Sequence, residues 1–452
     1  MYQGDRVYRF FTSASKGKFQ ALAESGLLDS LVSRGTVIDS LPVNEEEARE
    51  LRAAAPEGSL FVEHPRLPFV SYGYEWPFQM LKAAALTYLE VLQAAFEKGF
   101  MLKDATPFNV QFIGPKPVLI DVASFEPYQD GGPWVGYNEF CRMFLNPLLL
   151  QALTSVHFQP WLRGTLNGIY PRELSRLLSW RRKLRPDVFI NVILQAWLDN
   201  RFRSSGEIGK IVSQPRVARQ HLVKLMGRIK KTISGLKPGK SASSWTRYDW
   251  ENTYDAEGRG AKEAFVERVL AAQAPDVVWD LGCNTGTYSF IASRHAKHVV
   301  SMDQDPDVLD ILYDRASVQY PNILPLVVDV LDPSPERGWA QAERRGMLER
   351  GPADMVLALA LTHHLAISGN IPLPNIMAWL ARIARAGIVE YVPKNDPALQ
   401  TMLRWRDDIY SSYSQPAFEA AVREQFAVIE QCEIPGSGRV LYSVVRRGDQ
   451  RH

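Results

Sequence analysis

One segment of ten residues, 277–286, constrains the fold of this chain more than any other feature. Its sequence is VVWDLGCNTG, an apolar run that passes into small residues. Such a run predicts a buried strand followed by a tight turn, where the backbone can approach a ligand closely. Asp303 follows 23 residues after Asp280, at the end of the next apolar run. A carboxylate there can accept both hydroxyls of a ribose, so the segment predicts a nucleoside site.

Apolar runs alternate with helix-like segments through the C-terminal half of the chain. They lie at residues 277–279, 299–302, 326–328, 355–361 and 388–389. This alternation predicts an α/β fold, with a doubly wound parallel sheet and helices on both faces. Two later apolar runs, 426–430 and 440–445, flank a turn-like cluster at 435–438 and predict a terminal antiparallel hairpin.

The glycine segment departs from the nicotinamide-dinucleotide pattern. Asp280 precedes the first glycine, Asn284 takes the middle position, and there is no third glycine at the dinucleotide spacing. In these respects the segment resembles the first motif of class I S-adenosylmethionine-dependent methyltransferases. The resemblance extends over roughly residues 245–447 and implies a seven-stranded Rossmann-like sheet that ends in the antiparallel hairpin.

The resemblance also implies which residues hold the cofactor. The resemblance implies that the pocket for the amino-acid part of the cofactor is formed by Asp280, Gly282, Cys283, Asn284 and Gly286. It also implies that Asp303 binds the ribose and that Asp329 binds the adenine amine. The alternative role of Asp329 is that of a helix N-cap. Tyr254 belongs to an aromatic segment, 245–254, that either closes over the cofactor as a lid or packs on the sheet.

The segment 354–364, DMVLALALTHH, is expected to form the fourth strand and the loop after it. In the resembling family this loop lies beside the transferred methyl group. Methyl transfer from a sulfonium requires alignment of donor and acceptor, and removal of a proton from the acceptor. His364 or His363 can serve as the base because histidine titrates near neutral pH, unless it only packs or caps. Glu390 is the third candidate, with an ordinary strand-end acid as its alternative.

The N-terminal region, residues 1–200, carries a second pattern of polar residues. Asn109 follows Asp104 with four residues between them, and Asp121 comes twelve residues later, after an apolar run. This spacing resembles the catalytic and metal-binding loops of a kinase C-lobe, which implies a mainly helical α+β domain with an ATP and Mg²⁺ site. No glycine-rich loop or phosphate-pairing lysine is evident. The domain is therefore a degenerate scaffold that positions the acceptor, an active phosphotransferase, or an unrelated fold.

Charge is concentrated between the two regions. Lys and Arg total 52 against 50 Asp and Glu, so the net charge of +2 does not indicate a general nucleic-acid binder. Residues 201–240 nevertheless carry eleven basic residues and one acid. Apolar residues at 222–236 repeat every three to four positions, which predicts an amphipathic helix. We expect a basic connector, 201–244, that packs on a domain or contacts an anionic membrane or polyanion, and a methyltransferase domain over 245–452.

Taken over its length, the chain resembles a bacterial family of two-domain, NoeA-like methyltransferases. The similarity lies in the segments 74–78, 102–109 and 120–121. It implies transfer of a methyl group from S-adenosylmethionine to an oxygen or nitrogen of a carbohydrate or other small acceptor. Two alternatives stay open: a bifunctional methyltransferase and kinase, and a non-catalytic module that docks through the basic connector.

The cysteines and the N-terminus indicate the compartment. Cys141, Cys283 and Cys432 lie far apart, cannot form a zinc cluster alone, and leave one thiol unpaired in any disulfide scheme. The first residues lack the layout of a signal peptide, and the apolar runs are shorter than the roughly 18 residues of a spanning helix. We expect a cytoplasmic protein and no firm metal site.

Overall fold

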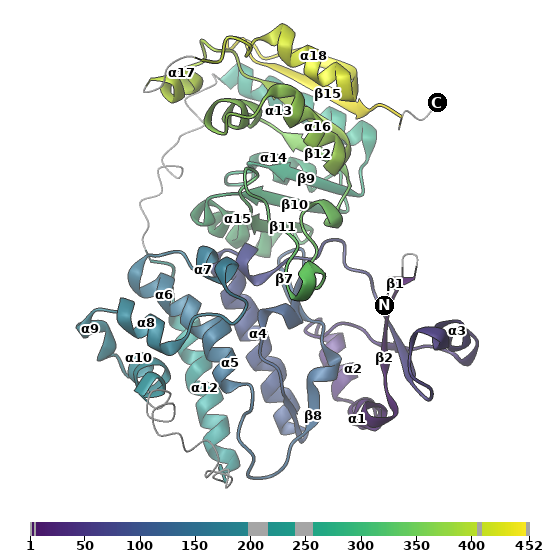
Figure 1. The fold of residues 1–452 in the computed structure, drawn as a ribbon, viewed down its shortest axis with the longest axis vertical. Coiled ribbons are helices and arrows are strands. Elements are labelled where there is room, and N and C mark those ends of the chain that lie inside the picture. Colours follow the sequence, from purple (N-terminus) through teal and green to yellow (C-terminus); the bar gives the residue numbers. More distant parts are fainter. Residues whose placement is uncertain (1, 4–5, 198–215, 240–255, 405–408, 449–452) are drawn as a thin grey trace. The chain divides into compact units, whose positions relative to one another are not determined.

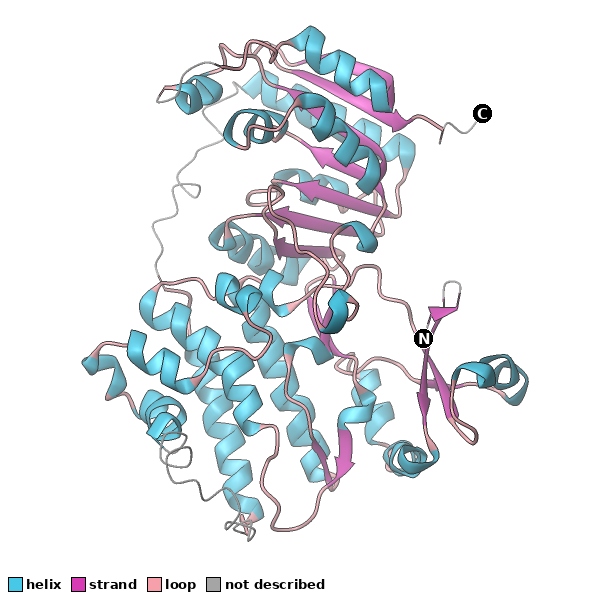
Figure 2. Cartoon of the chain, in the orientation of Figure 1, coloured by secondary structure: helices cyan, strands magenta, loops and turns pink. Residues whose placement is uncertain are grey.

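The computed structural model describes residues 2–3, 6–197, 216–239, 256–404 and 409–448 (Figure 1). The chain divides into two compact units, Met1–Ser241 and Ala242–His452. Helices dominate the first unit, and a single large sheet organises the second (Figure 2). Among the described residues, no helix has the length and hydropathy needed to cross a membrane.

The second unit is built on a seven-stranded sheet with the order β11-β10-β9-β12-β13-β15-β14. Its strands are β9 (Val277–Leu281), β10 (His298–Asp303), β11 (Ile323–Val327), β12 (Ala353–Ala358), β13 (Ala384–Tyr391), β14 (Phe426–Glu433) and β15 (Val440–Arg446). The first five strands of this order are parallel, whereas β15 pairs antiparallel with both β13 and β14. This confirms the predicted α/β sheet and its terminal hairpin. The order reverses between β9 and β12, and ligands bind at such a switch point.

Helices cover both faces of this sheet. They are α13 (Ala256–Gln273), α14 (Thr287–Ala292), α15 (Pro306–Gln319), η10 (His364–Ser368), α16 (Leu373–Ile383), α17 (Pro397–Leu403) and α18 (Gln415–Gln425), with the short turns η8 (Trp339–Gln341) and η9 (Leu348–Arg350). Apolar side chains of α13, α14 and α15 form one core with residues such as Val278, Leu357 and Ile388. Helix α16 packs against α18 and β13. The buried sheet therefore supplies a rigid base for the loops at its carboxyl edge.

The first unit begins with a four-stranded antiparallel sheet of order β1-β2-β4-β3 and continues mainly as helices. Its N-terminal elements are β1 (Tyr2–Gln3), β2 (Arg6–Phe11), α1 (Ser13–Glu24), α2 (Leu27–Ser33), β3 (Leu41–Pro42), α3 (Glu45–Leu51), η1 (Arg52–Ala54), β4 (Leu60–His64), η2 (Gly73–Glu75) and α4 (Phe78–Glu97). Two small hairpin-like pairs follow, from β5 (Phe100–Leu102), η3 (Pro107–Asn109), β6 (Val110–Ile113), β7 (Lys116–Leu119), η4 (Val122–Ser124) and β8 (Phe125–Pro127). The later elements are α5 (Tyr137–Phe140), η5 (Cys141–Leu145), α6 (Asn146–Thr154), α7 (Gln159–Gly164), α8 (Pro171–Leu177), α9 (Trp180–Lys183), α10 (Pro186–Val188), η6 (Phe189–Leu194) and α12 (Arg219–Gly235).

Helix α12 is the amphipathic helix that the sequence of the connector indicates. It packs on α4, and its buried residues are Leu222, Met226, Ile229 and Ile233. Lys82 of α4 donates a hydrogen bond to the backbone oxygen of Leu236 at 2.8 Å. The apolar face of α12 is therefore occupied within its own unit, and its basic face is exposed. Residues 198–215 and 240–255 of this region lie outside the described residues.

Candidate functional site

The turn between β9 and α14 has the backbone conformation that its small residues allow. Gly282, Asn284 and Gly286 have φ values of 71°, 49° and 94°, all in the left-handed region. The amides of Gly282 and Cys283 both donate to the carbonyl oxygen of Met302 on β10, at 2.8 and 3.0 Å. A Cβ atom at position 286 would lie 2.4 Å from a carbon of the Leu312 side chain. The turn therefore needs glycine there and is fixed to the neighbouring strand.

Asp280 lies beneath this turn and is fully buried. Its carboxylate accepts a hydrogen bond from the Ser289 hydroxyl at 2.6 Å, and the Ser301 hydroxyl donates in turn to Ser289 at 2.7 Å. Burial, assisted by the charge of Asp303, raises the pKa of Asp280 to about 7. Because a nearby cation would favour the ionised carboxylate, the surroundings of Asp280 suit a positively charged ligand group.

Asp303 ends β10 at the opposite side of the turn. Its two carboxylate oxygens accept hydrogen bonds from the amides of Asn284 and Asp305, at 2.9 and 3.0 Å. Burial raises the pKa of Asp303, and these amides oppose that shift. Each carboxylate oxygen has a second lone pair. The side chain is thus held in place and can still accept hydrogen bonds from two hydroxyls.

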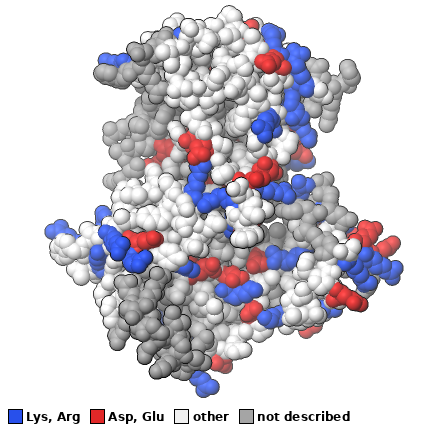
Figure 3. Space-filling model, viewed as in Figure 1, with Lys and Arg blue, Asp and Glu red and all other residues white. Residues whose placement is uncertain are grey.

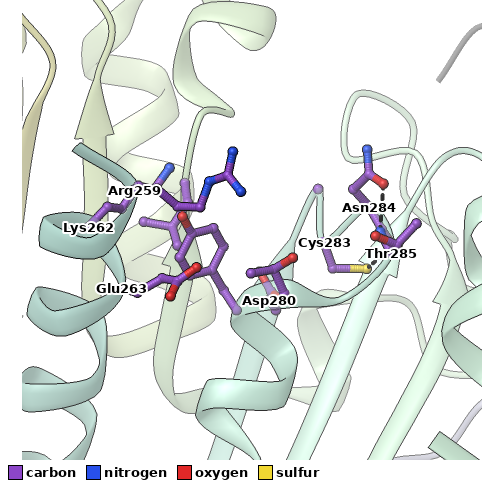
Figure 4. Close-up of a pocket in the computed structure, with 11 residues that line it drawn as sticks. Arg259, Lys262, Glu263, Asp280, Cys283, Asn284 and Thr285 are labelled. Carbon is purple, nitrogen blue, oxygen red and sulfur yellow. Dashed lines mark hydrogen bonds between the residues drawn. The ribbon is translucent and has the colours of Figure 1, made fainter. Parts of the chain in front are cut away.

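Two cavities meet at the turn, and Gly282 and Asn284 line both of them. The first cavity, of about 300 Å³, lies between the turn and helix α13 (Figure 4). In Figure 4 the side chains of Arg259, Lys262 and Glu263 come from α13, and Asp280 lies on the other side of this space. Cationic and anionic side chains both line this cavity, which suits a ligand that carries an ammonium and a carboxylate, such as an amino acid.

The second cavity, of about 210 Å³, lies over the carboxyl ends of β10, β11 and β12. Asp303 and Asp329 supply acidic groups to its wall. Its apolar lining consists mainly of Val328, Val330, Leu331, Leu361 and Leu365. Asp329 also accepts a hydrogen bond from the Leu331 amide at 2.9 Å, so it shapes its own turn as well as the wall. A flat apolar ring with polar edges fits such a lining.

The two histidines predicted as bases differ in their access to these cavities. His364 lines the second cavity, and its ring centroid lies 4.2 Å from that of His363. Burial, with a contribution from the charge of Arg439, lowers the pKa of His364 to about 4. His363 is 1% exposed, and neither of its ring nitrogens has a hydrogen-bond partner among the described residues. His363 lines neither cavity, so its position indicates packing rather than proton transfer.

Glu390, the third candidate base, lies among buried cations at the end of β13. It is fully buried and accepts hydrogen bonds from Lys262 Nζ at 2.7 Å and from the Ala360 amide at 2.8 Å. Arg439 Nη1 lies 3.3 Å from its second carboxylate oxygen. The carboxylate therefore has a cationic partner on each of its two oxygens. Glu390 fixes α13 to the strand ends on which the cavities are built.

The same cluster extends to the loops on both sides of Glu390. The Nε atom of Arg439 donates to Asp396 at 2.6 Å, and the Thr362 hydroxyl donates to the backbone oxygen of Glu390 at 2.7 Å. We call Lys262, Glu390, Asp396 and Arg439 the buried ion cluster. It joins α13, the loops after β12 and β13, and the start of β15.

The chain is 38% identical to the nodulation protein NoeA of Rhizobium meliloti (strain 1021) over 447 residues, which cover 98% of this chain and 92% of that protein. This chain belongs to the NoeA family. No protein-family model matches it. The strand order, the turn at 282–286 and the acid that ends β10 are the features implied by the resemblance to class I S-adenosylmethionine-dependent methyltransferases. The enzyme class predicted from the sequence is therefore confirmed.

Solved structures of methyltransferases are also similar to this NoeA-family protein. N-methyltransferase NodS from Bradyrhizobium japonicum WM9, in complex with S-adenosyl-L-homocysteine, has 13% identity and a TM-score of 0.33, over 45% of this chain and 96% of that chain. Magnesium protoporphyrin IX methyltransferase from Synechocystis PCC 6803, with bound S-adenosylmethionine, has 17% identity and a TM-score of 0.31, over 45% and 92%. The strand order of the protein itself shows the fold.

The kinase-like pattern of the first unit stays a prediction in this NoeA-family protein. Asp104 follows β5, Asn109 ends η3, and Asp121 caps η4 by accepting from the Ala123 amide at 3.3 Å. The guanidinium of Arg9 on β2 forms an ion pair with Asp121. Burial raises the pKa of Asp104, and the charge of Asp121 adds to that rise. Within the described ranges, no group of three or more potential ligands could hold a metal ion.

The sequence did not single out Arg259 and Lys262, which line the first cavity. The available signal is weak: Lys262 falls on the apolar stripe of α13 together with Phe265, Val266 and Val269, where a lysine is unusual. Tyr254, the predicted lid residue, lies outside the described residues.

Proposed function

We propose that this NoeA-family protein transfers the methyl group of S-adenosylmethionine to an oxygen or nitrogen of a carbohydrate or other small acceptor. The observation that carries the proposal is the pair of cavities that share Gly282 and Asn284. One cavity is lined by paired charges and the other by apolar side chains and two acids. An elongated ligand with an amino-acid end and a nucleoside end matches this division.

In this proposal the residues of the chain bind the two ends separately. Asp280 accepts the ammonium group, and Arg259 faces the carboxylate from α13. Asp303 accepts the ribose hydroxyls, with Asp329 at the edge of the adenine. The turn residues Gly282, Cys283, Asn284 and Gly286 supply backbone close to the ligand, because bulkier residues would fill that space.

The cofactor supplies an electrophilic methyl group on a sulfonium. The protein must then hold an acceptor in line with it and remove the acceptor proton. His364 is the candidate for this contact because it lines the nucleoside cavity at the end of the loop after β12. Its lowered pKa keeps the ring neutral near pH 7, so a ring nitrogen can accept a hydrogen bond from a hydroxyl or amine.

Two alternatives have less support. The first is phosphotransfer from ATP and Mg²⁺ at Asp104, Asn109 and Asp121. It has less support because Asp121, which would bind Mg²⁺, already forms an ion pair with the Arg9 guanidinium. The second is a docking module that uses the connector. It has less support because the apolar face of α12 is buried against α4 and does not face a partner. The first unit is then proposed as a scaffold that helps to position the acceptor.

Calorimetric titration with S-adenosylhomocysteine tests the cofactor site. We expect micromolar binding by the wild type, about −8 kcal/mol, and at least a tenfold loss for Asp303→Ala. Asp314→Ala is the matched control, since Asp314 lies on the neighbouring helix α15 at an exposed position. Failure of a folded wild-type protein to bind, or equal affinity of the Asp303→Ala variant, would contradict the proposal.

Turnover tests the acceptor and His364. Candidate carbohydrates and small amines are incubated with S-adenosylmethionine, and the methylated product is detected by mass spectrometry. For the true acceptor, His364→Ala should lower kcat while S-adenosylhomocysteine affinity changes little. An unchanged kcat would remove His364 from the reaction and leave the acceptor proton to solvent.

A further inference from the structure

The first unit exposes apolar side chains on three consecutive short elements. They belong to α9, α10 with its continuation η6, and the turn between them, and the largest are Trp180, Leu184, Phe189, Ile190 and Leu194. We call these five residues the exposed apolar patch. Trp180 and Leu184 are 68% and 69% exposed, and Phe189 is 50% exposed. Soluble proteins rarely expose several large apolar residues together unless that surface meets a partner or a membrane.

The helical segment formed by α10 and η6 carries three of the five patch residues. On its inner side Val188, Asn191 and Val192 are buried, and on its outer side lie Phe189, Ile190 and Leu194. No charged residue occurs from position 189 to 197. A helix on the surface of a soluble unit normally has a polar outer face. The outer face here is therefore built for an apolar environment.

Basic residues surround the patch. Residues 171–197 contain six Lys or Arg and two acids, six minus two giving a net charge of +4. Arg181 and Arg182 are exposed and follow Trp180 directly, and the Arg181 guanidinium lies 5.4 Å from the centre of the Trp180 ring. The two acids are engaged, because Asp187 pairs with Arg185 at 2.8 Å and Glu173 accepts from the Tyr170 amide at 3.1 Å. In Figure 3, Lys and Arg side chains gather over α8 and α9 at the left edge of the view.

We propose that residues 180–194 form a docking surface for an anionic lipid bilayer. Trp, Phe and Leu side chains flanked by arginines are the composition of segments that lie in the membrane interface. The apolar side chains enter the region below the head groups, and the guanidinium groups meet the lipid phosphates. Charge complementarity favours this occupant over a second copy of the chain, since two copies of a +4 surface repel each other.

This docking surface differs from the connector considered from the sequence. The basic face of α12 is exposed, yet its apolar face is buried on α4, so α12 offers charge without insertion. The exposed apolar patch and its flanking arginines offer charge together with side chains that can insert. The proposal is independent of the methyltransferase reaction, because none of its residues lines either cofactor cavity.

Sedimentation of the full-length protein with vesicles tests the proposal. Vesicles of phosphatidylcholine alone are compared with vesicles of three parts phosphatidylcholine to one part phosphatidylglycerol, which contain about 25% anionic lipid. We expect binding to the anionic vesicles, weakening as salt rises, and a blue shift of Trp180 fluorescence that Trp180→Phe removes. Arg181→Gln with Arg182→Gln should weaken binding about 25-fold, at about fivefold per basic residue.

The apolar contribution is tested with matched variants. Trp180→Ala with Phe189→Ala should weaken vesicle binding at least about tenfold. Trp339→Ala is the control, because Trp339 is 84% exposed in the second unit and should not affect binding. Arg228→Gln with Lys231→Gln on α12 removes the same charge elsewhere and should have little effect.

Several results would overturn the proposal. The first is that the wild type does not bind anionic vesicles, or binds heparin or DNA but not vesicles. The second is that the α12 variant loses as much vesicle binding as the Arg181 and Arg182 variant. The third is a dimer, seen by sedimentation velocity, that depends on the exposed apolar patch. S-adenosylhomocysteine affinity should be the same in all these variants, so loss of vesicle binding is distinguished from loss of the cofactor site.

Discussion

Replacement of Glu390 by glutamine removes the negative charge that faces two buried cations. Lys262 and Arg439 are each 1% exposed, and Arg439 retains Asp396 at 2.6 Å in this variant. The unfavourable change therefore falls mainly on Lys262, which loses its carboxylate at 2.7 Å. Removing one member of a buried pair typically costs about 3–5 kcal/mol of stability. Burial lowers the pKa of Lys262, so the lysine can lose its proton, and the cost should decrease as pH rises.

Hydrogen exchange read by mass spectrometry reports this cost in the full-length protein. Peptides from β12 and β13 should exchange about two to four orders of magnitude faster in Glu390→Gln, since 1.36 kcal/mol corresponds to a factor of ten. Peptides from α4 in the first unit serve as the internal reference. Glu430→Gln is the matched control because its pair with Arg268 is exposed, and it should cost less than about 1 kcal/mol.

A double variant distinguishes an unpaired charge from general loss of packing. Glu390→Gln with Lys262→Met removes both members of the pair, so it should be more stable than Glu390→Gln alone. If the double variant were no better than the single one, or if Glu390→Gln were as mild as Glu430→Gln, the argument from uncompensated charge would be refuted.

Three further predictions concern other parts of the two units. Burial raises the pKa of Asp280 in the folded protein to about 7, from 3.8 in the unfolded chain. Between these two values the folded protein keeps a proton that the unfolded chain releases. The stability that this proton contributes is therefore fully present below about pH 4 and is lost as the pH rises to 7. Urea unfolding should therefore show a larger decrease of stability over this range in the wild type than in Asp280→Asn. Gly286→Ala should lower the free energy of unfolding by about 1–3 kcal/mol and weaken S-adenosylhomocysteine binding. Gly260→Ala in α13 should not destabilise the protein, because no atom lies within 4 Å of the new Cβ. In α12, Met226→Ala should cost about 2–5 kcal/mol by denaturation, and Val223→Ala, which is half-exposed, should be nearly neutral.

The features that the sequence predicted are those set by neighbouring residues. The strand β9 and its turn depend on an apolar run followed by Gly282 and Gly286, and the hairpin depends on two runs around a turn. Asp303 is predicted from its place at the end of the next apolar run, 23 residues after Asp280. Each of these inferences needs only local periodicity and one topological rule.

The contacts that the sequence did not predict join residues far apart in the chain. Lys262 and Glu390 are 128 positions apart, and Arg9 and Asp121 are 112 apart. No periodicity connects such pairs, so Glu390 resembled an ordinary strand-end acid or a base until its partners were known. The apolar spacing of α12 likewise predicted a buried face but not α4 as its neighbour. In the same way, the apolar segment 186–194 gave no sign that one side would stay exposed.

The position of β15 in the sheet has a consequence for synthesis of the chain. β15 lies between β13 and β14, although both of these strands precede it in the sequence. Until the ribosome has made residues 440–446, β13 has an open hydrogen-bonding edge and β14 has no strand to pair with. The first unit is by then complete and can fold early, whereas the second must wait for its last strand. A nascent chain stalled after β14 should therefore hold a folded first unit attached to an aggregation-prone sheet.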